Sequence, residues 1–237
     1  MKRVALVAGA TGVLGRAVCR ELSARGALVV CGYATRRQEA EALAAELNGF
    51  AVELRSGTDL TKTVNAVVER HGGLDILVNA AGINREGSAG ALGSEDWRAV
   101  FEVNLDFAFR LTQAVLPPML RRHHGRIVHL SSIAGRAGGR GQINYAVSKA
   151  AIERMVRVFA LEVGRKGITV NCVAPGVIVS DMTERIRAEH GEELLSHIAC
   201  RRFGKPEEVA KAVAFLVGEE AGYINGVVLP VDGGMAI

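Results

Sequence analysis

The sequence predicts an α/β fold in which a parallel sheet of seven strands is covered by helices on both faces. Short, continuously apolar runs alternate with segments of helical periodicity, a pattern typical of buried parallel strands joined by helical crossovers. Aliphatic residues are abundant: 49% of the 237 residues are hydrophobic, although aromatic residues account for only 5%. Glycine is enriched as well, with 28 residues. This composition favours closely packed layers of helix and sheet, and it excludes a disordered or collagen-like chain.

A single domain, residues 1–237, accounts for the whole chain, because no repeat, linker or low-complexity tract divides it. A chain of this length can bury one large core. Strands are expected at residues 4–8, 28–31, 50–54, 76–78, 127–130, 169–173 and 227–231. Helices are expected at residues 14–25, 37–47, 60–71, 94–120 and 145–164. The stretch 178–203 is polar with only a weak helical period, and we expect it to form an irregular lid over the site.

Charge and cysteine spacing exclude several other functional classes. The net charge is only +4 and the basic residues are spread along the chain, so we expect no nucleic-acid partner. Cys19, Cys31 and Cys172 lie in apolar runs and should be buried. His123 and His124 are adjacent, a poor spacing for ligands on one helix, so no metal site is expected. The apolar runs are too short for a signal peptide or a membrane span, so cytoplasm or an organelle matrix is the expected location.

A glycine-rich turn follows the first strand and opens the first helix. The turn reads Gly9-Ala10-Thr11-Gly12-Val13-Leu14-Gly15. Glycine permits a positive φ and a close backbone approach, while a helix N-terminus directs N–H groups and a positive dipole toward an anion. In the first strand–helix unit of a parallel sheet, this combination suits the pyrophosphate of a dinucleotide. The alternative is a turn that is merely tight.

The end of the second strand indicates which dinucleotide is bound. An acidic residue there would hydrogen-bond the 2′-hydroxyl of the adenosine ribose, but none occurs between residues 28 and 38. Arg36 and Arg37 lie there instead, and guanidinium groups suit a 2′-phosphate. We therefore expect NADPH as the cofactor, with NADH less favoured. In the alternative interpretation, both arginines simply begin an exposed helix.

Three further residues form a candidate catalytic group. Ser132 follows the fifth strand, Tyr145 comes thirteen residues later, and Lys149 lies one helical turn beyond Tyr145. A nearby ammonium stabilises a phenolate and lowers the pKa of the tyrosine, which can then donate a proton to a carbonyl oxygen as hydride arrives. The serine hydroxyl can hydrogen-bond the same oxygen. A Tyr and a Lys at this spacing also occur as a surface pair, but the serine and the glycine-rich turn disfavour that interpretation.

With these motifs the sequence strongly resembles the short-chain dehydrogenase/reductases, over essentially the whole chain. Asn79-Ala80-Ala81-Gly82 is similar to the family's Asn-Asn-Ala-Gly after the fourth strand, and Asn104 matches the helical asparagine of the catalytic tetrad. Pro175-Gly176 with Ser180 resembles the segment that holds the nicotinamide carboxamide. Residues 223–226 and 231–234 resemble the C-terminal signature. The resemblance implies a Rossmann-type, doubly wound fold.

The resemblance also implies a role for each site residue. Tyr145 would be the general acid and base, with Lys149 lowering its pKa and holding the nicotinamide ribose. Ser132 would orient the substrate carbonyl, and Asn104 would support a water that links Lys149 to solvent. The residues implied to contact the cofactor are Gly9, Thr11, Gly12, Val13, Leu14, Gly15, Arg36, Arg37, Glu53, Asn79, Ala80, Ala81, Gly82, Tyr145, Lys149, Pro175, Gly176, Ile178 and Ser180.

The sequence departs from the family's pattern in two places. Short members usually carry Gly-x-x-x-Gly-x-Gly in the first turn, whereas Val13 occupies the middle glycine position here. Gly12 replaces a basic residue that often assists the 2′-phosphate. The second departure is Ala199-Cys200-Arg201-Arg202-Phe203-Gly204, where relatives usually read Pro-Leu-Gly-Arg-Phe-Gly. It lies at the end of the expected lid and so bears on substrate choice.

Within the family, the chain most resembles the 3-oxoacyl-(acyl-carrier-protein) reductases of fatty-acid synthesis, through residues 79–85 and 202–209. This implies NADPH-dependent reduction of a 3-oxoacyl thioester to the 3-hydroxyacyl product. Those enzymes dock an acidic carrier protein on a basic patch, and Arg121, Arg122, Arg165 and Lys166 fall in the corresponding segments. His123 stands where relatives often have a docking arginine.

Other functions remain open at this point. A ketoreductase of polyketide or small carbonyl substrates, or an alcohol dehydrogenase, would carry the same motifs. A non-catalytic nucleotide-binding sensor would be expected to lack the tyrosine or the lysine, and both are present. The resemblance implies a homotetramer in which helices 94–120 and 145–164 pack against their mates, and a hetero-oligomer stays open. Acyl-chain length, carrier preference, pathway and direction are not indicated.

Overall fold

The computed structural model describes residues 2–236 and confirms the fold class. Within this range one sheet has seven strands in the order β3-β2-β1-β4-β5-β6-β7, and every neighbouring pair is parallel. The strand bounds are β1 Val4–Ala8, β2 Leu28–Tyr33, β3 Phe50–Glu53, β4 Ile76–Asn79, β5 Gly125–Leu130, β6 Ile168–Pro175 and β7 Val228–Val231. The order reverses between β1 and β4, and such a switch point opens a crevice at the carboxyl ends of the strands.

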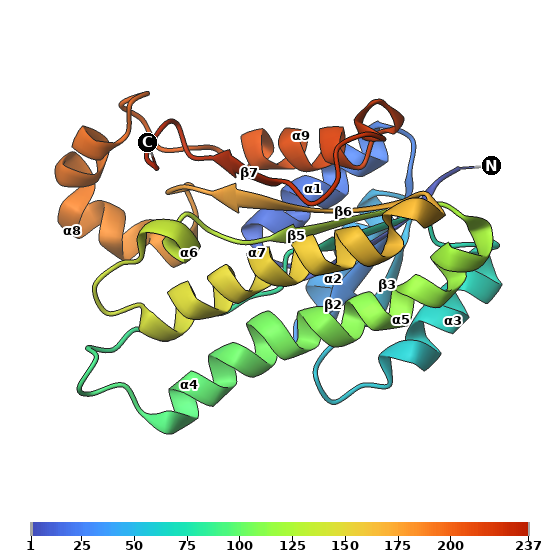
Figure 1. The fold of residues 1–237 in the computed structure, drawn as a ribbon, viewed down its shortest axis with the longest axis horizontal. Helices are drawn as coiled ribbons and strands as arrows, with labels where there is room; N and C mark the ends of the chain where they lie inside the picture. The colour runs from blue at the N-terminus through green and yellow to red at the C-terminus, as the bar shows by residue number, and fades with distance from the viewer. Residues whose placement is uncertain (1, 237) are drawn as a thin grey trace.

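Helices cover both faces of this sheet (Figure 1). One face carries α3 Leu60–His71, α5 Phe107–Arg122 and α7 Ile143–Val163, and the other carries α1 Val13–Ala24, α2 Arg37–Glu46 and α9 Pro206–Leu216. The helices α6 Ala134–Ala137 and α8 Asp181–His197 lie at the end of the sheet toward which the strands point. The remaining helical segments are α4 Ser94–Phe101, the π-helix η1 Glu102–Asp106, and the 3-10 turns η2 Gly164–Lys166 and η3 Glu219–Ala221.

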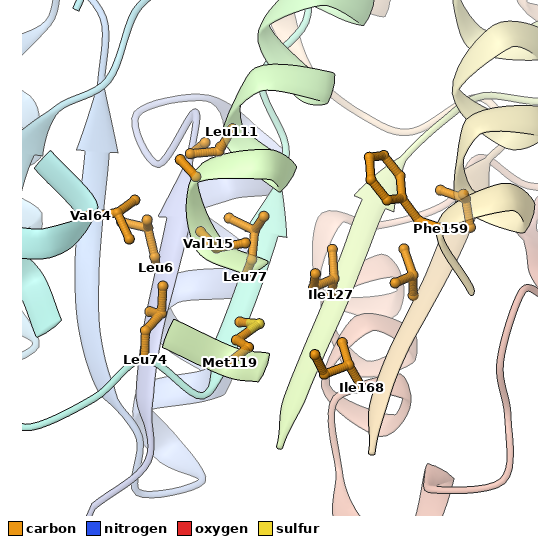
Figure 2. Close-up of a cluster of buried hydrophobic side chains, with 14 of the residues drawn as sticks. Leu6, Val64, Leu74, Leu77, Leu111, Val115, Met119, Ile127, Phe159 and Ile168 are labelled. Atoms are coloured by element: carbon orange, nitrogen blue, oxygen red, sulfur yellow. The ribbon is translucent and has the colours of Figure 1, made fainter. Parts of the chain in front are cut away.

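The strands are apolar throughout because both of their faces are buried. Along β1, Leu6 packs in the cluster beneath α3, α5 and α7, whereas its neighbour Val7 packs in the cluster beneath α1, α2 and α9. Figure 2 shows the first cluster, in which Leu77 of β4 lies beside Val115 of α5. Fully burying one such side chain contributes about 1.5–3 kcal/mol. The two cores hold the sheet between its helices and thereby fix the positions of the strand ends.

The helices differ from expectation more than the strands, whose bounds agree to within about two residues. The expected helix 94–120 is divided by the wide turn η1 and continues to Arg122. The expected irregular lid 178–203 contains the 17-residue helix α8, which is kinked at His190 and has no buried residue. An apolar stripe, the main signal for a helix, is therefore weak there. The expectations also lacked α9, although Pro206 at its first position and Glu208 in its first turn are ordinary start signals.

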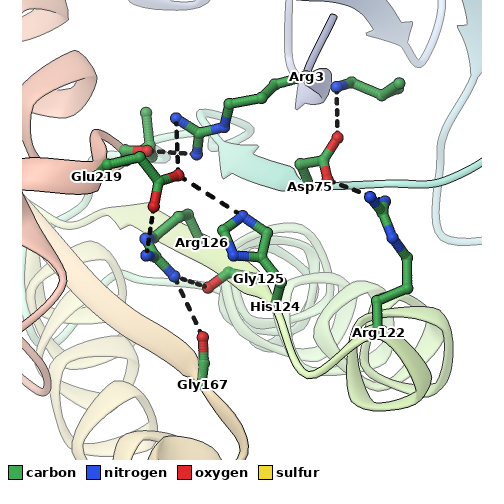
Figure 3. A network of polar contacts seen from close by, with 10 residues as sticks. Arg3, Asp75, Arg122, His124, Gly125, Arg126, Gly167 and Glu219 are labelled. Atoms are coloured by element: carbon green, nitrogen blue, oxygen red, sulfur yellow. Dashed lines mark hydrogen bonds and ion pairs between the residues drawn. The ribbon is translucent and has the colours of Figure 1, made fainter. Parts of the chain in front are cut away.

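Ion pairs close the amino ends of the strands, at the edge of the sheet opposite α8 (Figure 3). Asp75, just before β4, accepts the backbone N–H of Val4 at 2.8 Å and pairs with Arg122 at 2.9 Å. Arg126 of β5 pairs with Glu219 at 3.2 Å, next to the start of β6. These contacts join segments from both ends of the chain, and they leave the carboxyl edge for the site.

Three further observations concern residues 2–236. Within residues 2–236, no helix combines the length and the apolar character needed to cross a membrane. The same range holds no group of three or more His, Cys, Asp or Glu side chains arranged to bind a metal ion. Cys19, Cys31 and Cys172 are buried free thiols, as expected, while Cys200 is exposed.

Candidate active site

Three polar side chains meet where β5 and α7 come together. Ser132 follows β5, and Tyr145 and Lys149 lie in the first turns of α7, so all three stand at the carboxyl edge of the sheet. The Ser132 side chain lies close enough to the Tyr145 phenol to influence its pKa, and the Ser132 hydroxyl accepts the N–H of Ala134 at 3.2 Å. The Lys149 Nζ lies 5.5 Å from the centroid of the Tyr145 ring and donates to the Leu130 carbonyl oxygen at 2.9 Å. The structure therefore brings the predicted serine, tyrosine and lysine together.

Burial governs the protonation of this group. It raises the pKa of the Tyr145 phenol above its ordinary value, and the nearby Ser132 hydroxyl opposes that shift. It lowers the pKa of the Lys149 ammonium to about 8, with Cys172 acting in the opposite direction. The expected lowering of the Tyr145 pKa by Lys149 is not found, because burial has the larger effect and the ammonium is directed to Leu130.

Asn104 is fully buried in the π-helix η1, a type of turn that is frequent at functional sites. Its Oδ1 accepts the N–H of Ile83 at 2.8 Å, and its amide donates to the Ile83 carbonyl oxygen and the Ser148 hydroxyl, each at 3.0 Å. A Cβ at Gly82 would meet the Lys149 Nζ at 3.2 Å and the Asn104 Oδ1 at 3.4 Å. Asn104 therefore holds the segment after β4 against Lys149.

The glycine-rich turn forms the second part of the site. Gly9 has φ +73°, and a Cβ there would lie 2.7 Å from the backbone nitrogen of Ala81. A Cβ at Gly15 would lie 2.1 Å from the Gly9 carbonyl oxygen. The first intrahelical bond of α1 joins the Arg16 N–H to the Gly12 carbonyl oxygen at 2.9 Å, and the Gly12 N–H donates to the Gly9 carbonyl oxygen at 3.0 Å. The N–H groups of residues 13–15 therefore remain for an external acceptor. These close approaches and N–H groups fit the pyrophosphate of a dinucleotide.

A cavity of about 770 Å³ connects the glycine-rich turn with the start of α8. Met182 of α8 and Ala210 of α9 form part of its wall. Its volume lies within the range of small-molecule and cofactor sites. The lining residues that the sequence predicts as cofactor contacts are Thr11, Gly12, Val13, Leu14, Gly15, Arg36, Ala80, Gly82 and Ser180.

The other predicted cofactor residues do not line this cavity. Arg37 is exposed and pairs with Glu41 at 2.7 Å, and Glu53 pairs with Arg55 at 2.6 Å. Ile178 lines a separate cavity of about 230 Å³. The remaining predicted cofactor residues that do not line the 770 Å³ cavity are Gly9, Asn79, Ala81, Tyr145, Lys149, Pro175 and Gly176.

Arg16 belongs to the cavity wall and was not among the sequence-based candidates. Its Nε donates to the Thr11 carbonyl oxygen at 3.0 Å, and its guanidinium forms an ion pair with Glu39. Arg36 reaches the same Glu39 carboxylate at 3.5 Å. Two guanidinium groups therefore converge on one carboxylate beside the cavity. The sequence signal that could have identified Arg16 as a cavity residue is its position directly after Gly15, the last glycine of the turn.

Known proteins are similar to this chain over nearly its whole length. The family profile described as enoyl-(acyl carrier protein) reductase matches residues 9–236. Nodulation protein G of Rhizobium sp. (strain N33) is 43% identical over 240 residues, which cover 99% of this chain and 97% of that protein. The 3-oxoacyl-(acyl-carrier-protein) reductase of Thermotoga maritima is 38% identical over 241 residues, 99% of this chain and 98% of that enzyme. The reductase of the same name from Escherichia coli (strain K12) is 39% identical over 237 residues, 98% and 97% of the two chains.

The chain belongs to the short-chain dehydrogenase/reductase family. It is therefore an NAD(P)H-dependent oxidoreductase. The residues present fit a nicotinamide dinucleotide, because the glycine turn and the first N–H groups of α1 suit its pyrophosphate. The cavity wall also includes Gly82, where a Cβ would meet the Lys149 Nζ at 3.2 Å.

Proposed function

We propose that this short-chain dehydrogenase/reductase uses NADPH to reduce a 3-oxoacyl thioester, carried on an acyl carrier protein, to the 3-hydroxyacyl product. The observation that carries the proposal is the placement of Ser132 near the Tyr145 phenol, with Lys149 Nζ 5.5 Å from the Tyr145 ring centroid, at the carboxyl edge of the sheet. The identity of 38% and 39% to two 3-oxoacyl-(acyl-carrier-protein) reductases over nearly their full length supports the substrate class.

In the proposed reaction, the hydroxyls of Ser132 and Tyr145 both hydrogen-bond the oxygen of the 3-oxo group and stabilise the negative charge that develops there. The bound cofactor supplies the hydride. Tyr145 donates its phenolic proton to the oxygen as a general acid, and its raised pKa keeps the phenol protonated beforehand. The ammonium of Lys149, held by the Leu130 carbonyl oxygen, then stabilises the phenolate.

The arginines beside the cavity support NADPH rather than NADH. Arg16 and Arg36 already converge on the Glu39 carboxylate, which shows that an anion is favourable at this point. A 2′-phosphate would be a stronger acceptor for the same two groups. Titration of the protein with each reduced cofactor, followed by nicotinamide fluorescence, tests this choice. Equal or tighter binding of NADH contradicts it and leaves the reaction type unaffected.

The proposed carrier-docking residues lie far from the reacting groups. Arg165 and Lys166 follow the end of α7, about 30 Å along the helix from Tyr145. Arg122 is engaged by Asp75, whereas Arg165 and Lys166 have no ion-pair partner within residues 2–236. Exposed, unpaired cations suit an acidic partner and give salt-sensitive association.

A charge reversal separates docking from chemistry. Replacing Arg165 and Lys166 with glutamate should raise the KM for carrier-linked acetoacetyl and leave the KM for the coenzyme-A thioester unchanged. The same assay tests Arg121, which is exposed at the end of α5. An equal effect on both substrates would place carrier docking elsewhere.

A homotetramer is proposed from the exposed apolar side chains of α4, α5 and α7. Phe109 on α5 and Val147 and Leu161 on α7 are 43%, 43% and 85% exposed, respectively, and Trp97 on α4 is 37% exposed. Packing of these helices against second copies would cover them. Light scattering that reports a monomer at micromolar concentration would contradict the tetramer.

The reaction is tested by following the loss of NADPH absorbance with a panel of substrates. Turnover of acetoacetyl thioesters is expected, and turnover only of ketones that are not thioesters would instead identify a ketoreductase of small carbonyl substrates. The lid end at residues 199–202, where the sequence departs from its relatives, favours testing this second candidate.

We also propose a reducing compartment such as the cytoplasm, since Cys19, Cys31, Cys172 and Cys200 are all free.

A further inference from the structure

His129 is a fully buried histidine on β5 that the proposed chemistry does not use. Its ring lies between Asn79 on β4 and Thr112 on α5. The distance from Nδ1 to the Asn79 Nδ2 is 3.4 Å, and the distance from Nε2 to the Thr112 Oγ1 is 3.1 Å. The Asn79 and Thr112 side chains are buried as well. Solvent therefore does not supply alternative partners, and each donor must find its acceptor within this group.

The contact with Thr112 on α5 determines whether the Nε2 of His129 carries a proton. The Thr112 hydroxyl has a single hydrogen, which it donates to the Ala108 carbonyl oxygen at 2.8 Å. The hydroxyl oxygen can then only accept from His129, so Nε2 carries the proton. The strand end gives the same result independently. The Asn79 Oδ1 accepts the N–H of Ala81 at 3.2 Å, so the amide NH₂ of Asn79 is turned toward His129 Nδ1, which must accept.

A single continuous chain of hydrogen bonds follows from these two assignments. It runs from the Ala81 N–H through Asn79 and His129 to Thr112 and the backbone of α5. Protonating both ring nitrogens would place a donor against the Asn79 amide. Burial lowers the pKa of His129 to about 4, with the charge of Lys149 acting in the same direction, so the ring stays neutral.

This chain of hydrogen bonds ends at the wall of the cofactor cavity. Ala80 and Gly82 line the cavity, and a Cβ at Gly9 would collide with Ala80 and Ala81. The segment 79–83, which contributes Ala80 and Gly82 to the cavity wall, has two side-chain anchors. Asn104 in η1 binds Ile83 at one end, and Thr112 in α5, through His129 and Asn79, holds the N–H of Ala81 at the other. Both anchors belong to the same continuous helical segment, so the segment sets the position of the wall.

We propose that His129 is a positioning residue for cofactor binding, which holds the segment 79–83, and with it the wall residues Ala80 and Gly82, through the amide of Asn79. The inference rests on the binding of a nicotinamide cofactor at this cavity and does not depend on the identity of the carbonyl substrate. If the ring cannot accept from Asn79, the amide can rotate, and the Ala81 N–H then loses its acceptor beside the glycine-rich turn.

The test compares two replacements of His129 in the full-length protein. Leucine offers no polar atom, whereas glutamine can accept from Asn79 through its oxygen and donate to Thr112 through its nitrogen. His129→Leu should raise the Kd for NADPH, measured by fluorescence titration, about tenfold, the effect of one unsatisfied buried group. His129→Gln should restore the Kd to within about threefold of the wild type. Equal Kd values for His129→Leu and the wild type would overturn the proposal.

A second pair of variants keeps the test independent of whether His129→Leu folds. Thr112→Val removes the acceptor for Nε2 and preserves the shape of the side chain, and it should also weaken NADPH binding severalfold. Thr112→Ser retains the hydroxyl and should bind NADPH as the wild type does. Thr169→Val is the matched control, because the buried Thr169 hydroxyl has no hydrogen-bond partner within the described residues. An equal change in Kd for Thr112→Val and Thr169→Val would reduce His129 to a core residue.

Nitrogen NMR of labelled histidine reports the assignment directly. The wild-type protein should show Nε2 protonated and Nδ1 unprotonated at neutral pH, and Thr112→Val should shift or broaden both resonances. A ring that carries its proton on Nδ1 in the wild-type protein would overturn the proposal, whatever the binding data show.

Discussion

Replacing Tyr145 with phenylalanine removes one oxygen atom and leaves the ring in place beside Lys149. The proposed mechanism assigns to this oxygen the proton that reaches the substrate, and Ser132 lies near it. General acid catalysis by a positioned side chain contributes about 10²–10⁴ in rate. We therefore expect kcat to fall by that factor, which corresponds to about 3–5 kcal/mol of transition-state stabilisation.

The decisive measurement separates chemistry from cofactor binding. Turnover of acetoacetyl thioester is followed by NADPH absorbance, and the Kd for NADPH is measured on the same preparation by fluorescence. The Kd should stay within about threefold of the wild-type value, since the cavity wall is formed mainly by the glycine-rich turn and α1 and includes no residue of α7. Ser132→Ala serves as the matched control, because it should lower kcat while the proton donor is retained. If Tyr145→Phe keeps more than a tenth of the wild-type kcat, the assignment of the acid is wrong.

Three further predictions use other parts of the molecule. Burial holds the pKa of Lys149 at about 8 in the folded protein, below its ordinary 10.5, so the unfolded chain binds more protons between these values and stability should rise with pH across that window. Lys149→Met should abolish this rise, measured by urea unfolding across that pH range. Leu111→Ala should cost about 2–5 kcal/mol in the same assay, because Leu111 is fully buried under the sheet, and a loss below 1 kcal/mol would contradict its packing. Glu39→Gln should tighten NADPH binding severalfold with little effect on NADH, while Glu41→Gln, whose partner Arg37 is outside the cavity, should change neither.

The strands and the polar group on α7 could be predicted because they depend on local order. An apolar run such as residues 4–8 is buried on both faces wherever a parallel sheet forms, so its composition is sufficient. The spacing of Tyr145 and Lys149 is a property of one helix. Ser132 could be predicted because it comes two residues after the last residue of β5.

Features that depend on contacts between distant segments could not be predicted from local order. The pKa of Tyr145 rises because of burial, which no spacing of residues reveals. The ion pair of Arg16 with Glu39 joins α1 to α2, and the hydrogen bonds of His129 join β4, β5 and α5. Helix α8 has no buried residue, so its formation leaves almost no periodic pattern in the sequence.

The π-helix η1 has a consequence for how this part of the chain tolerates changes in length. An α-helix advances about 100° per residue, so deleting one residue from 102–106 to restore a regular helix would rotate α5 relative to α4 by about that angle. Either Asn104 would turn away from Ile83, or Leu111 would turn away from the sheet. The wide turn thus sets the angular phase between two helical faces that serve different purposes. We expect this enzyme to tolerate insertions and deletions here far less than substitutions. The number of residues in segment 94–122 is then constrained as strongly as their identity.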